Sequence, residues 1–298
     1  TFSMINLFAK IETFHPTGSF KHRGATHKLN QVRLLDPDAL RRGIYTASAG
    51  NHAQGVARAA TESGYESHIY VPETAPQRKI EAIVKYGGEV TVVAGGFDTA
   101  LSVAEQSCKA VSGVFIHPFD DPDVINGQAG VGKEIAAEAT FYDRVFVPVG
   151  GGGLLAGTLK ALAAYSPETK VYGVQLKGSD AFTQSYQARE LIELNTVNVL
   201  SDGTAVKKVG RYTLTAALTS PNFGGCIVVD NAELYKAMVR QDELIEVEAE
   251  AAGTLAYAGM LRVLKTEALP DHTRENWLGI VSGHHRDASL FKQLSLSA

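Results

Sequence analysis

The stretch that decides the fold is Arg144-Val-Phe-Val-Pro148-Val-Gly150-Gly-Gly-Gly153-Leu-Leu-Ala-Gly157. Its first five residues are typical of a buried strand, and the residues after the glycines have helical periodicity as far as Tyr165. Four consecutive glycines would be costly in chain entropy for a mere turn. Without side chains, their backbone N–H groups can close on a phosphate, and the helix N-terminus adds a favourable field. We predict a phosphate-binding loop at Gly150–Gly153, with a tight packing corner as the alternative.

The residues around this loop narrow the choice of phosphate. A P-loop requires lysine and then serine or threonine after the last glycine, but Leu154 and Leu155 stand there. A dinucleotide loop matches loosely through Gly151, Gly153 and Ala156. That loop needs an acidic residue at the end of the next strand, which here reads Gln175-Leu176-Lys177. A nicotinamide cofactor is therefore disfavoured.

The same strand–helix alternation extends in both directions from the loop. Short apolar runs predict strands at 5–11, 43–47, 68–71, 89–93, 114–117, 144–148, 170–176, 226–229 and 277–281. Helical periodicity predicts helices at 24–34, 53–62, 76–86, 97–112, 124–140, 154–165, 211–219, 231–243 and 250–266. Residues 189–225 are the least regular, and we expect loops there apart from the helix at 211–219. Successive βα units predict an α/β protein with parallel sheets flanked by helices.

Composition excludes several classes of function. The chain has 298 residues, a net charge of −4 and 45% hydrophobic residues, as is ordinary for a globular protein. No basic run stands out, so nucleic acid is not an expected partner. No apolar run is long enough for a membrane span. Cys108 and Cys226 lack metal-like spacing, which favours two reduced thiols in a cytoplasmic protein and no metal site.

A lysine stands at the start of a predicted helix in Pro16-Thr-Gly-Ser-Phe20-Lys21-His-Arg-Gly24. A cation is poorly placed there for simple stability, because the positive end of the helix dipole repels it. The same field, together with partial desolvation, can make an amine nucleophilic. Taken alone, the stretch fits a solvated surface lysine equally well. With the glycine loop, it suits a lysine that carries a phosphorylated aldehyde cofactor.

Three motifs carry a resemblance to a known family. They are Gly18-Ser-Phe-Lys-His-Arg-Gly-Ala25, Thr46-Ala-Ser-Ala-Gly-Asn-His-Ala-Gln-Gly55 and Val147-Pro-Val-Gly-Gly-Gly-Gly-Leu-Leu-Ala-Gly157. The chain resembles the serine/threonine dehydratases, pyridoxal-phosphate enzymes of the tryptophan-synthase β-like fold. The resemblance extends from about Asn6 to Ser289, with the motifs in family order. It implies a large cofactor-binding domain of residues 1–42 and 123–298, and a small mobile domain of residues 43–122.

The resemblance also implies the role of each site residue. Lys21 forms the Schiff base with pyridoxal 5′-phosphate and then acts as general base on the substrate Cα. The cofactor-binding residues are expected to be Phe20, Lys21, Asn51, Gly150, Gly151, Gly152, Gly153, Leu154 and Ser282. The expected substrate-binding residues are Ser48, Ala49, Gly50 and His52, on a loop entering a helix, where donors could hold the α-carboxylate.

The implied reaction is dehydration and deamination of an L-β-hydroxy amino acid, such as threonine or serine, to a 2-oxo acid and ammonia. A homodimer is expected from the resemblance alone. Two departures affect the substrate: the family commonly reads Ser-Gly-Gly/Ala-Asn where this chain has Ser282-Gly283-His284-His285, and Glu250-Ala251-Ala252-Gly253 replaces Glu-Pro-Ser/Thr-Gly/Ala. The short N-terminus is a third departure. The alternatives are a racemase, a β-replacement enzyme and a cofactor-binding homologue without turnover.

Overall fold

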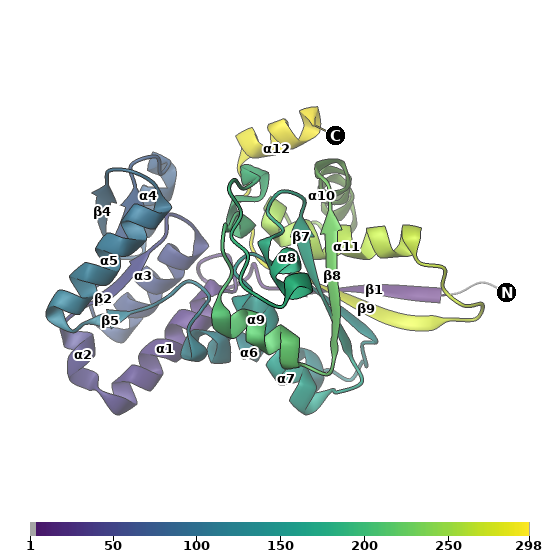
Figure 1. Cartoon of the computed structure of the whole chain (residues 1–298), viewed down its shortest axis with the longest axis horizontal. Helices are drawn as coiled ribbons and strands as arrows, with labels where there is room; N and C mark the ends of the chain where they lie inside the picture. The colour runs from purple at the N-terminus through teal and green to yellow at the C-terminus, as the bar shows by residue number, and fades with distance from the viewer. Residues whose placement is uncertain (1–3, 298) are drawn as a thin grey trace. The chain divides into compact units, whose positions relative to one another are not determined.

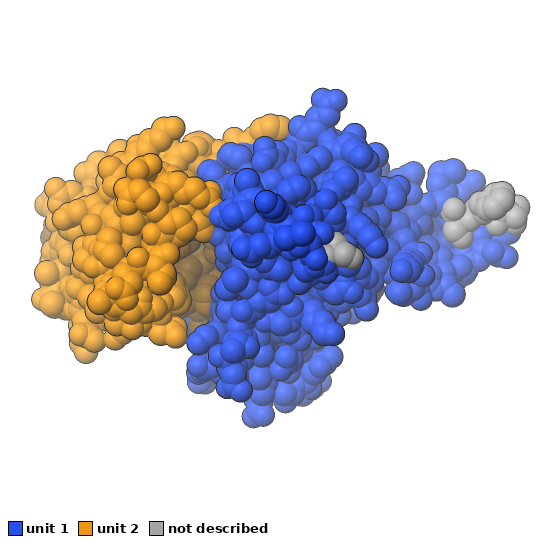
Figure 2. Space-filling view, turned by 90° about the horizontal axis from the view of Figure 1, so that it is seen from above, with its two compact units in different colours: residues 1–13, 129–298 blue, residues 14–128 orange. Residues whose placement is uncertain are grey.

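The computed structural model describes residues 4–297 and divides by internal contacts into two compact units (Figures 1 and 2). One unit comprises Thr1–Thr13 with Ala129–Ala298, and the other Phe14–Gln128. The second unit therefore takes in the lysine segment as well as residues 43–122. That residues 43–122 move as a small domain stays a prediction, and residues 1–3 and 298 of the predicted large domain lie outside the described residues.

The unit of Phe14–Gln128 is built on a four-stranded parallel sheet in the order β4-β3-β2-β5. Its strands are β2 (Ile44–Ala47), β3 (Ser67–Pro72), β4 (Glu89–Val93) and β5 (Val114–Phe115). Its helices are α1 (Lys21–Leu35), α2 (Pro37–Arg41), α3 (Asn51–Ser63), α4 (Gln77–Lys85) and α5 (Phe97–Val111). Apolar side chains of α1 and α3 pack on the sheet in one core, which includes Leu29, Val56 and Ile69.

The other unit contains a five-stranded parallel sheet in the order β1-β9-β6-β7-β8. Its strands are β1 (Met4–Ile11), β6 (Arg144–Pro148), β7 (Lys170–Leu176), β8 (Phe223–Val229) and β9 (Arg274–Val281). Its helices are α7 (Gly153–Tyr165), α8 (Ala181–Ala188), α9 (Arg211–Thr219), α10 (Asn231–Ile245), α11 (Ala251–Thr266) and α12 (Ala288–Leu296), with a 3₁₀ helix at Val199–Thr204. Helix α6 (Pro122–Ala137) contains the boundary between the two units.

Both faces of the five-stranded sheet are covered by helices, as buried parallel sheets require. Successive residues of a strand point to opposite faces. On β7, a Cβ at Gly173 would meet Leu155 of α7, whereas the next residue, Val174, touches Gly259 of α11. Helices α7 and α11 therefore lie on opposite faces, and the glycine loop leads from the end of β6 into the helix on one of them.

The parallel sheets and flanking helices confirm the predicted α/β class, and the differences have local causes. Helix α2 is only five residues long, too short for a period to show, and begins at Pro37 after the Asp36 cap. Strand β8 begins three residues earlier than predicted because Gly224 and Gly225 hide its pattern. A Cβ at Gly224 would collide with the Tyr172 ring, which explains the glycine. Within the described residues, no helix is both long and apolar enough to cross a membrane.

Candidate active site

Lys21 is the first residue of α1, which begins three residues before the predicted helix of 24–34. Its Nζ donates a hydrogen bond to the carbonyl oxygen of Pro118 at 2.8 Å and lies 5.2 Å from the centroid of the Phe20 ring. The carbonyl accepts from the amine in a partly buried setting. The amine is therefore held at a defined place by a residue 97 positions away, unlike the amine of a solvated surface lysine.

Two glycines on neighbouring helices bring the backbone around Lys21 close to its surroundings. A Cβ at Gly55 of α3 would lie 3.0 Å from the backbone nitrogen of His22 and 3.1 Å from the carbonyl carbon of Lys21. A Cβ at Gly127 of α6 would lie 2.7 Å from the carbonyl oxygen of Arg23. The first turn of α1 thus packs directly against the backbone of two other helices. These contacts fix the position of the Lys21 backbone.

The predicted substrate loop leads directly into α3. Ser48 Oγ accepts a hydrogen bond from the Gly50 N–H at 3.1 Å, and Gly50 is the N-cap of α3. Asn51 is the first helical residue, and the N-cap residue Gly50 has no side chain that could cap this end. Ala49 packs against the apolar core of its unit. The N–H groups of the first helical turn and the helix dipole suit a carboxylate.

The His52 side chain is buried and engaged by protein groups. Its Nε2 lies 3.0 Å from the Ile116 carbonyl oxygen and 3.0 Å from Thr46 Oγ1. A carbonyl oxygen only accepts hydrogen bonds, so Nε2 of the neutral ring carries the proton and Nδ1 is unprotonated. Burial, reinforced by the charge of Lys21, lowers the pKa of His52 to about 3, and the ring is neutral. The predicted contact of His52 with the substrate therefore rests on its backbone N–H rather than on its imidazole.

This buried neutral ring makes stability depend on pH. The folded pKa is about 3 against an ordinary value of 6.5, so on acidification the unfolded chain takes up the proton first. The contribution is present above the ordinary value and is lost as the pH falls toward the folded value. Between pH 7 and pH 5 the loss is about 2 kcal/mol in the free energy of unfolding.

Urea unfolding of wild type and His52→Gln at both pH values measures this loss. The glutamine amide can still donate to Ile116 but does not titrate. The variant should lose less stability on acidification by about 2 kcal/mol. Equal pH dependence in the two proteins would contradict the neutral buried state of His52.

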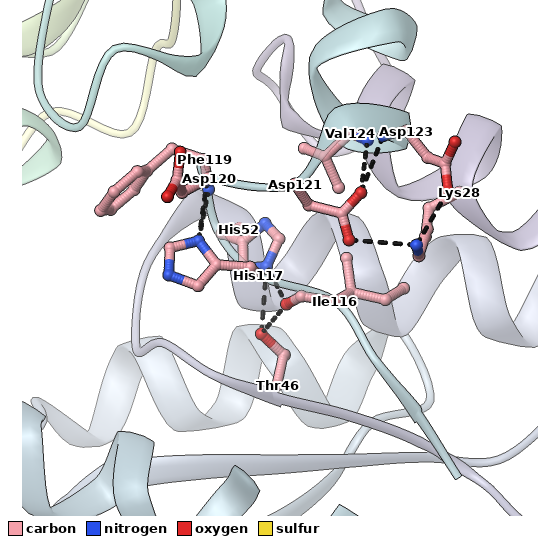
Figure 3. A network of polar contacts seen from close by, with 10 residues as sticks. All are labelled: Lys28, Thr46, His52, Ile116, His117, Phe119, Asp120, Asp121, Asp123 and Val124. Carbon is pink, nitrogen blue, oxygen red and sulfur yellow. Dashed lines mark hydrogen bonds and ion pairs between the residues drawn. The ribbon is translucent and has the colours of Figure 1, made fainter. Parts of the chain in front are cut away.

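A second histidine of this unit, His117, was not among the predicted site residues, and Figure 3 shows its hydrogen bonds. Its Nδ1 accepts hydrogen bonds from the backbone N–H groups of Phe119 at 3.2 Å and Asp120 at 2.8 Å. Burial lowers the pKa of His117, the charge of Lys21 acts in the same direction, and Asp120 and Asp121 oppose them. The pair His117-Pro118 after a predicted strand was the only available signal, because an isolated histidine does not reveal its partners.

The glycine loop follows β6 in the other unit. Gly152 has φ +95°, and a Cβ there would lie 2.8 Å from both Phe182 and Thr213, so only glycine fits. The Gly151 carbonyl accepts from Thr213 Oγ1 at 2.7 Å. Gly152 is also the N-cap of α7 and has no side chain that could cap this helix. Glycines followed by the N–H donors of a helix start are a donor set that fits a phosphate.

Gln175 stabilises this loop through hydrogen bonds, which explains why an amide and not an acidic residue stands near the end of β7. Its side chain is buried and donates to the carbonyls of Val149 at 3.2 Å and Ser179 at 3.0 Å. Its carbonyl oxygen accepts from the backbone N–H and the hydroxyl of Thr183. Because the buried Gln175 amide forms its hydrogen bonds with protein groups, it does not bind a ribose hydroxyl. This is consistent with the sequence argument against a dinucleotide cofactor. The sequence did not indicate this bracing role.

Ser282 follows β9 and is buried, with Oγ 3.5 Å from the Ala252 carbonyl oxygen. A Cβ at Gly253 would collide with the Gly283 carbonyl oxygen, so the start of α11 lies against the loop after β9. The two altered segments of the sequence are thus in contact with each other. The rings of His284 and His285 lie 4.4 Å apart. No group of three or more potential metal ligands occurs within residues 4–297.

The predicted site residues thus fall in two sets. Lys21 and the Ser48–His52 loop lie in the unit of Phe14–Gln128, with Phe20. The glycine loop, Leu154 and Ser282 lie in the unit that holds the five-stranded sheet. Each set forms a local arrangement with its own hydrogen bonds, and each includes a partner that sequence reasoning missed, His117 in the first and Gln175 in the second.

Known proteins resemble the chain over most of its length. It is 39% identical over 271 residues to an L-threonine dehydratase, biosynthetic IlvA, of Burkholderia multivorans, a match that covers 90% of this chain and 52% of the relative. It is 35% identical over 283 residues to an L-threonine dehydratase, catabolic TdcB, of Staphylococcus aureus, covering 95% and 80%. The chain therefore spans about half the length of the first relative and most of the second.

Solved structures agree with these relatives. The processed form of threonine deaminase isoform 2 from Solanum lycopersicum matches with a TM-score of 0.92 and 34% identity, covering 99% of this chain and 83% of that one. Maize serine racemase matches with a TM-score of 0.87 and 30% identity, covering 98% and 87%. The family described as "Pyridoxal-phosphate dependent enzyme" matches residues 3–283. The chain accordingly belongs to the family of pyridoxal-phosphate-dependent enzymes.

Proposed function

We propose that this chain catalyses α,β-elimination of an L-β-hydroxy amino acid, with threonine or serine as substrate, and releases a 2-oxo acid and ammonia. The observation that carries the proposal is the Lys21 amine, held at the Pro118 carbonyl inside the family's lysine motif. The 39% identity to an L-threonine dehydratase supports the choice of reaction. Release of 2-oxo acid from a panel of β-hydroxy amino acids by the cofactor-loaded protein tests it.

The residues that would hold the cofactor fit its chemistry. When bound, pyridoxal phosphate links to a lysine amine through its aldehyde and delocalises electrons released at the substrate Cα. The N–H groups of Gly150–Gly153 and Leu154 would bind the phosphate. Asn51 would bind the ring hydroxyl, Phe20 would pack on a ring face, and Ser282 would face the ring nitrogen.

Lys21 would have two successive duties. Its amine would hold the cofactor and, later in the reaction, would take the proton from the substrate Cα. The backbone donors at Ser48–His52 would hold the α-carboxylate and so orient that Cα–H bond. The proton taken from Cα and the β-hydroxyl would leave together as water, and hydrolysis of the resulting enamine would give the 2-oxo acid and ammonia.

Ser282 favours elimination over slower fates of the same carbanion. A hydroxyl, unlike a carboxylate, does not stabilise a protonated ring nitrogen. Electrons at Cα are then held less tightly, which favours immediate loss of the β-hydroxyl over a long-lived carbanion. The dehydratase-like loop Ser48–His52 argues against β-replacement by a second nucleophile. A cofactor-binding protein without turnover would show cofactor absorbance with no 2-oxo acid from any member of the panel.

Racemisation is the alternative that uses the same carbanion, and Ala49 argues against it. In the related serine racemases a serine hydroxyl stands at this loop position and acts on the face opposite the lysine. The Ala49 methyl group neither donates nor accepts a proton. We expect the amino acid that remains after partial turnover to contain little D-isomer. Chiral chromatography alongside a 2-oxo acid assay measures both products.

Ala49→Ser provides the matched comparison, since it adds only a hydroxyl. The variant should form more D-isomer per 2-oxo acid than wild type. Wild-type formation of D-isomer at a rate comparable to that of 2-oxo acid would overturn the elimination assignment. It would point to another acid–base group, and His284 and His285 would be the first residues to test.

The remaining features of the proposal come from the family resemblance and the composition. An amino-acid substrate agrees with the dehydratases that the chain resembles. A homodimer and a cytoplasmic location stay predictions. Sedimentation of the purified protein tests the first of these, and fractionation of the source cells tests the second.

A further inference from the structure

The loop of residues 116–121 is held by hydrogen bonds at its start, in its middle and at its end (Figure 3). At its start, the Ile116 carbonyl accepts from Thr46 Oγ1 at 2.7 Å and lies 3.0 Å from His52 Nε2. At its end, Asp121 Oδ1 accepts from the backbone N–H groups of Asp123 and Val124 and so caps α6. Asp121 also pairs with Lys28 of α1 at 3.1 Å. Both ends of the loop are therefore anchored.

The middle of the loop is fixed by the His117 ring. Both N–H groups that follow Pro118 point back at His117 Nδ1, at 3.2 and 2.8 Å. Pro118 has no N–H of its own, and its ring fixes φ. The His117 ring packs edge-on against the Phe119 ring, with centroids 4.7 Å apart. The direction of the Pro118 carbonyl is thus set by one imidazole nitrogen acting as a double acceptor.

That carbonyl is the acceptor for the Lys21 amine, at 2.8 Å. A neutral imidazole is required for this arrangement, because a proton on Nδ1 would abolish both N–H bonds. The surroundings favour the neutral imidazole. Burial and the Lys21 charge lower the pKa of His117, and together they outweigh the charges of Asp120 and Asp121, which raise it. A hydrogen-bonded chain therefore runs from the imidazole through the Pro118–Phe119 peptide group to the catalytic amine, and the Asp120 N–H bond holds the next peptide to the same nitrogen.

We propose that His117 is a positioning residue, whose Nδ1 fixes the loop so that the Pro118 carbonyl holds the Lys21 amine ready for reaction. The inference rests on the role proposed above for Lys21 and assigns a new function to a residue of the same unit. His117 itself touches neither substrate nor reacting atoms in this scheme. It acts through the backbone that it orders.

The consequence for catalysis is geometric. An amine that alternates between tether and base has to return to one place in each turnover. A misplacement of about 1 Å at a reacting group can cost about 100-fold in rate. A loosened loop should therefore reduce kcat, whereas binding of the amino acid, which uses the Ser48–His52 loop, should change little.

The test compares His117→Asn with His117→Phe. Asparagine Oδ1 stands where Nδ1 stands relative to Cβ and can accept both N–H groups, as in an Asx turn. Phenylalanine preserves the ring and its packing but offers no acceptor. We expect His117→Phe to lower kcat by about 100-fold with KM changed by less than about threefold, and His117→Asn to stay within about threefold of wild type.

A second readout does not depend on turnover. When pyridoxal phosphate is mixed with protein stripped of cofactor, the rise of the protein-bound absorbance band reports how quickly Lys21 reacts. His117→Phe should slow this step by about tenfold or more, and His117→Asn should not. Wild-type rates in His117→Phe would overturn the proposal. Equal loss in both variants would also overturn it, since the ring rather than its acceptor would then matter.

Near-UV circular dichroism and thermal unfolding show whether each variant is folded. Should His117→Phe fail to fold, ¹⁵N spectra of histidine-labelled wild type decide the question: a proton on Nε2 alone is expected at neutral pH. A proton on Nδ1 at neutral pH would overturn the proposal. The loading rate and the spectra require no knowledge of the substrate, so they can fail independently of the elimination reaction.

Discussion

Lys21→Ala is expected to abolish covalent attachment of pyridoxal phosphate and to lower the elimination rate by about 10⁴-fold or more. The effect should be this large because the same amine attaches the cofactor and takes the Cα proton. Its removal therefore eliminates both functions at once. Borohydride reduction followed by peptide mapping identifies the attached lysine, and 2-oxo acid release gives the rate.

Lys21→Arg is the matched control. Arginine retains the positive charge and can still donate to the Pro118 carbonyl, but its guanidinium stays protonated and forms no link to an aldehyde. It should therefore be as inactive as the alanine variant while preserving the local fold. A reducible cofactor adduct at another lysine, or turnover in either variant, would disprove the assignment of Lys21.

The second large effect is expected at the glycine loop. In Gly151→Val, a branched side chain would block the approach of a phosphate to the backbone N–H groups. We expect cofactor affinity to fall by at least about 100-fold, since most of the phosphate's hydrogen bonds would be lost. Titration of the stripped protein with pyridoxal phosphate measures the affinity, and thermal unfolding without cofactor measures the cost to the fold.

Gly152 provides the contrasting variant. It has φ +95°, and a Cβ would lie 2.8 Å from Phe182 and Thr213, so Gly152→Ala should destabilise the chain even without cofactor. Substitution at Gly152 thus mixes two effects that Gly151→Val separates. If Gly151→Val lowered stability and left cofactor affinity unchanged, the loop would be a packing corner and not a phosphate site.

Most of the fold could be predicted from the sequence because most of its helices and strands are long enough to show the hydrophobic periodicity of their type. Strands 89–93, 144–148 and 170–176 have the predicted bounds, and their alternation with helices predicted parallel sheets correctly. Helices α8 and α12, of eight and nine residues, were not predicted, although α4 and α9, each of nine residues, were. Short elements depend on tertiary contacts more than on local pattern.

The site could be predicted only in part, for a different reason. Motifs reveal residues whose neighbours in sequence share their task, such as Lys21 or the four glycines. His117 and Gln175 work through backbone groups of segments brought to them by folding, and the Lys21–Pro118 bond joins residues 97 positions apart. Nothing in a local pattern encodes such a partner, so these roles required coordinates.

The close approach of Gly55 and Gly127 to the first turn of α1 bears on how this chain can be engineered. Neither residue carries a reactive group, yet a methyl at either would push on the helix that bears the lysine. In a saturation library selected for turnover, both positions should behave as immutable and be mistaken for chemical participants. Altered substrate range is better sought in the side chains of the Ser48–His52 loop, where a Cβ at Gly50 would meet no atom of the described chain within 4 Å.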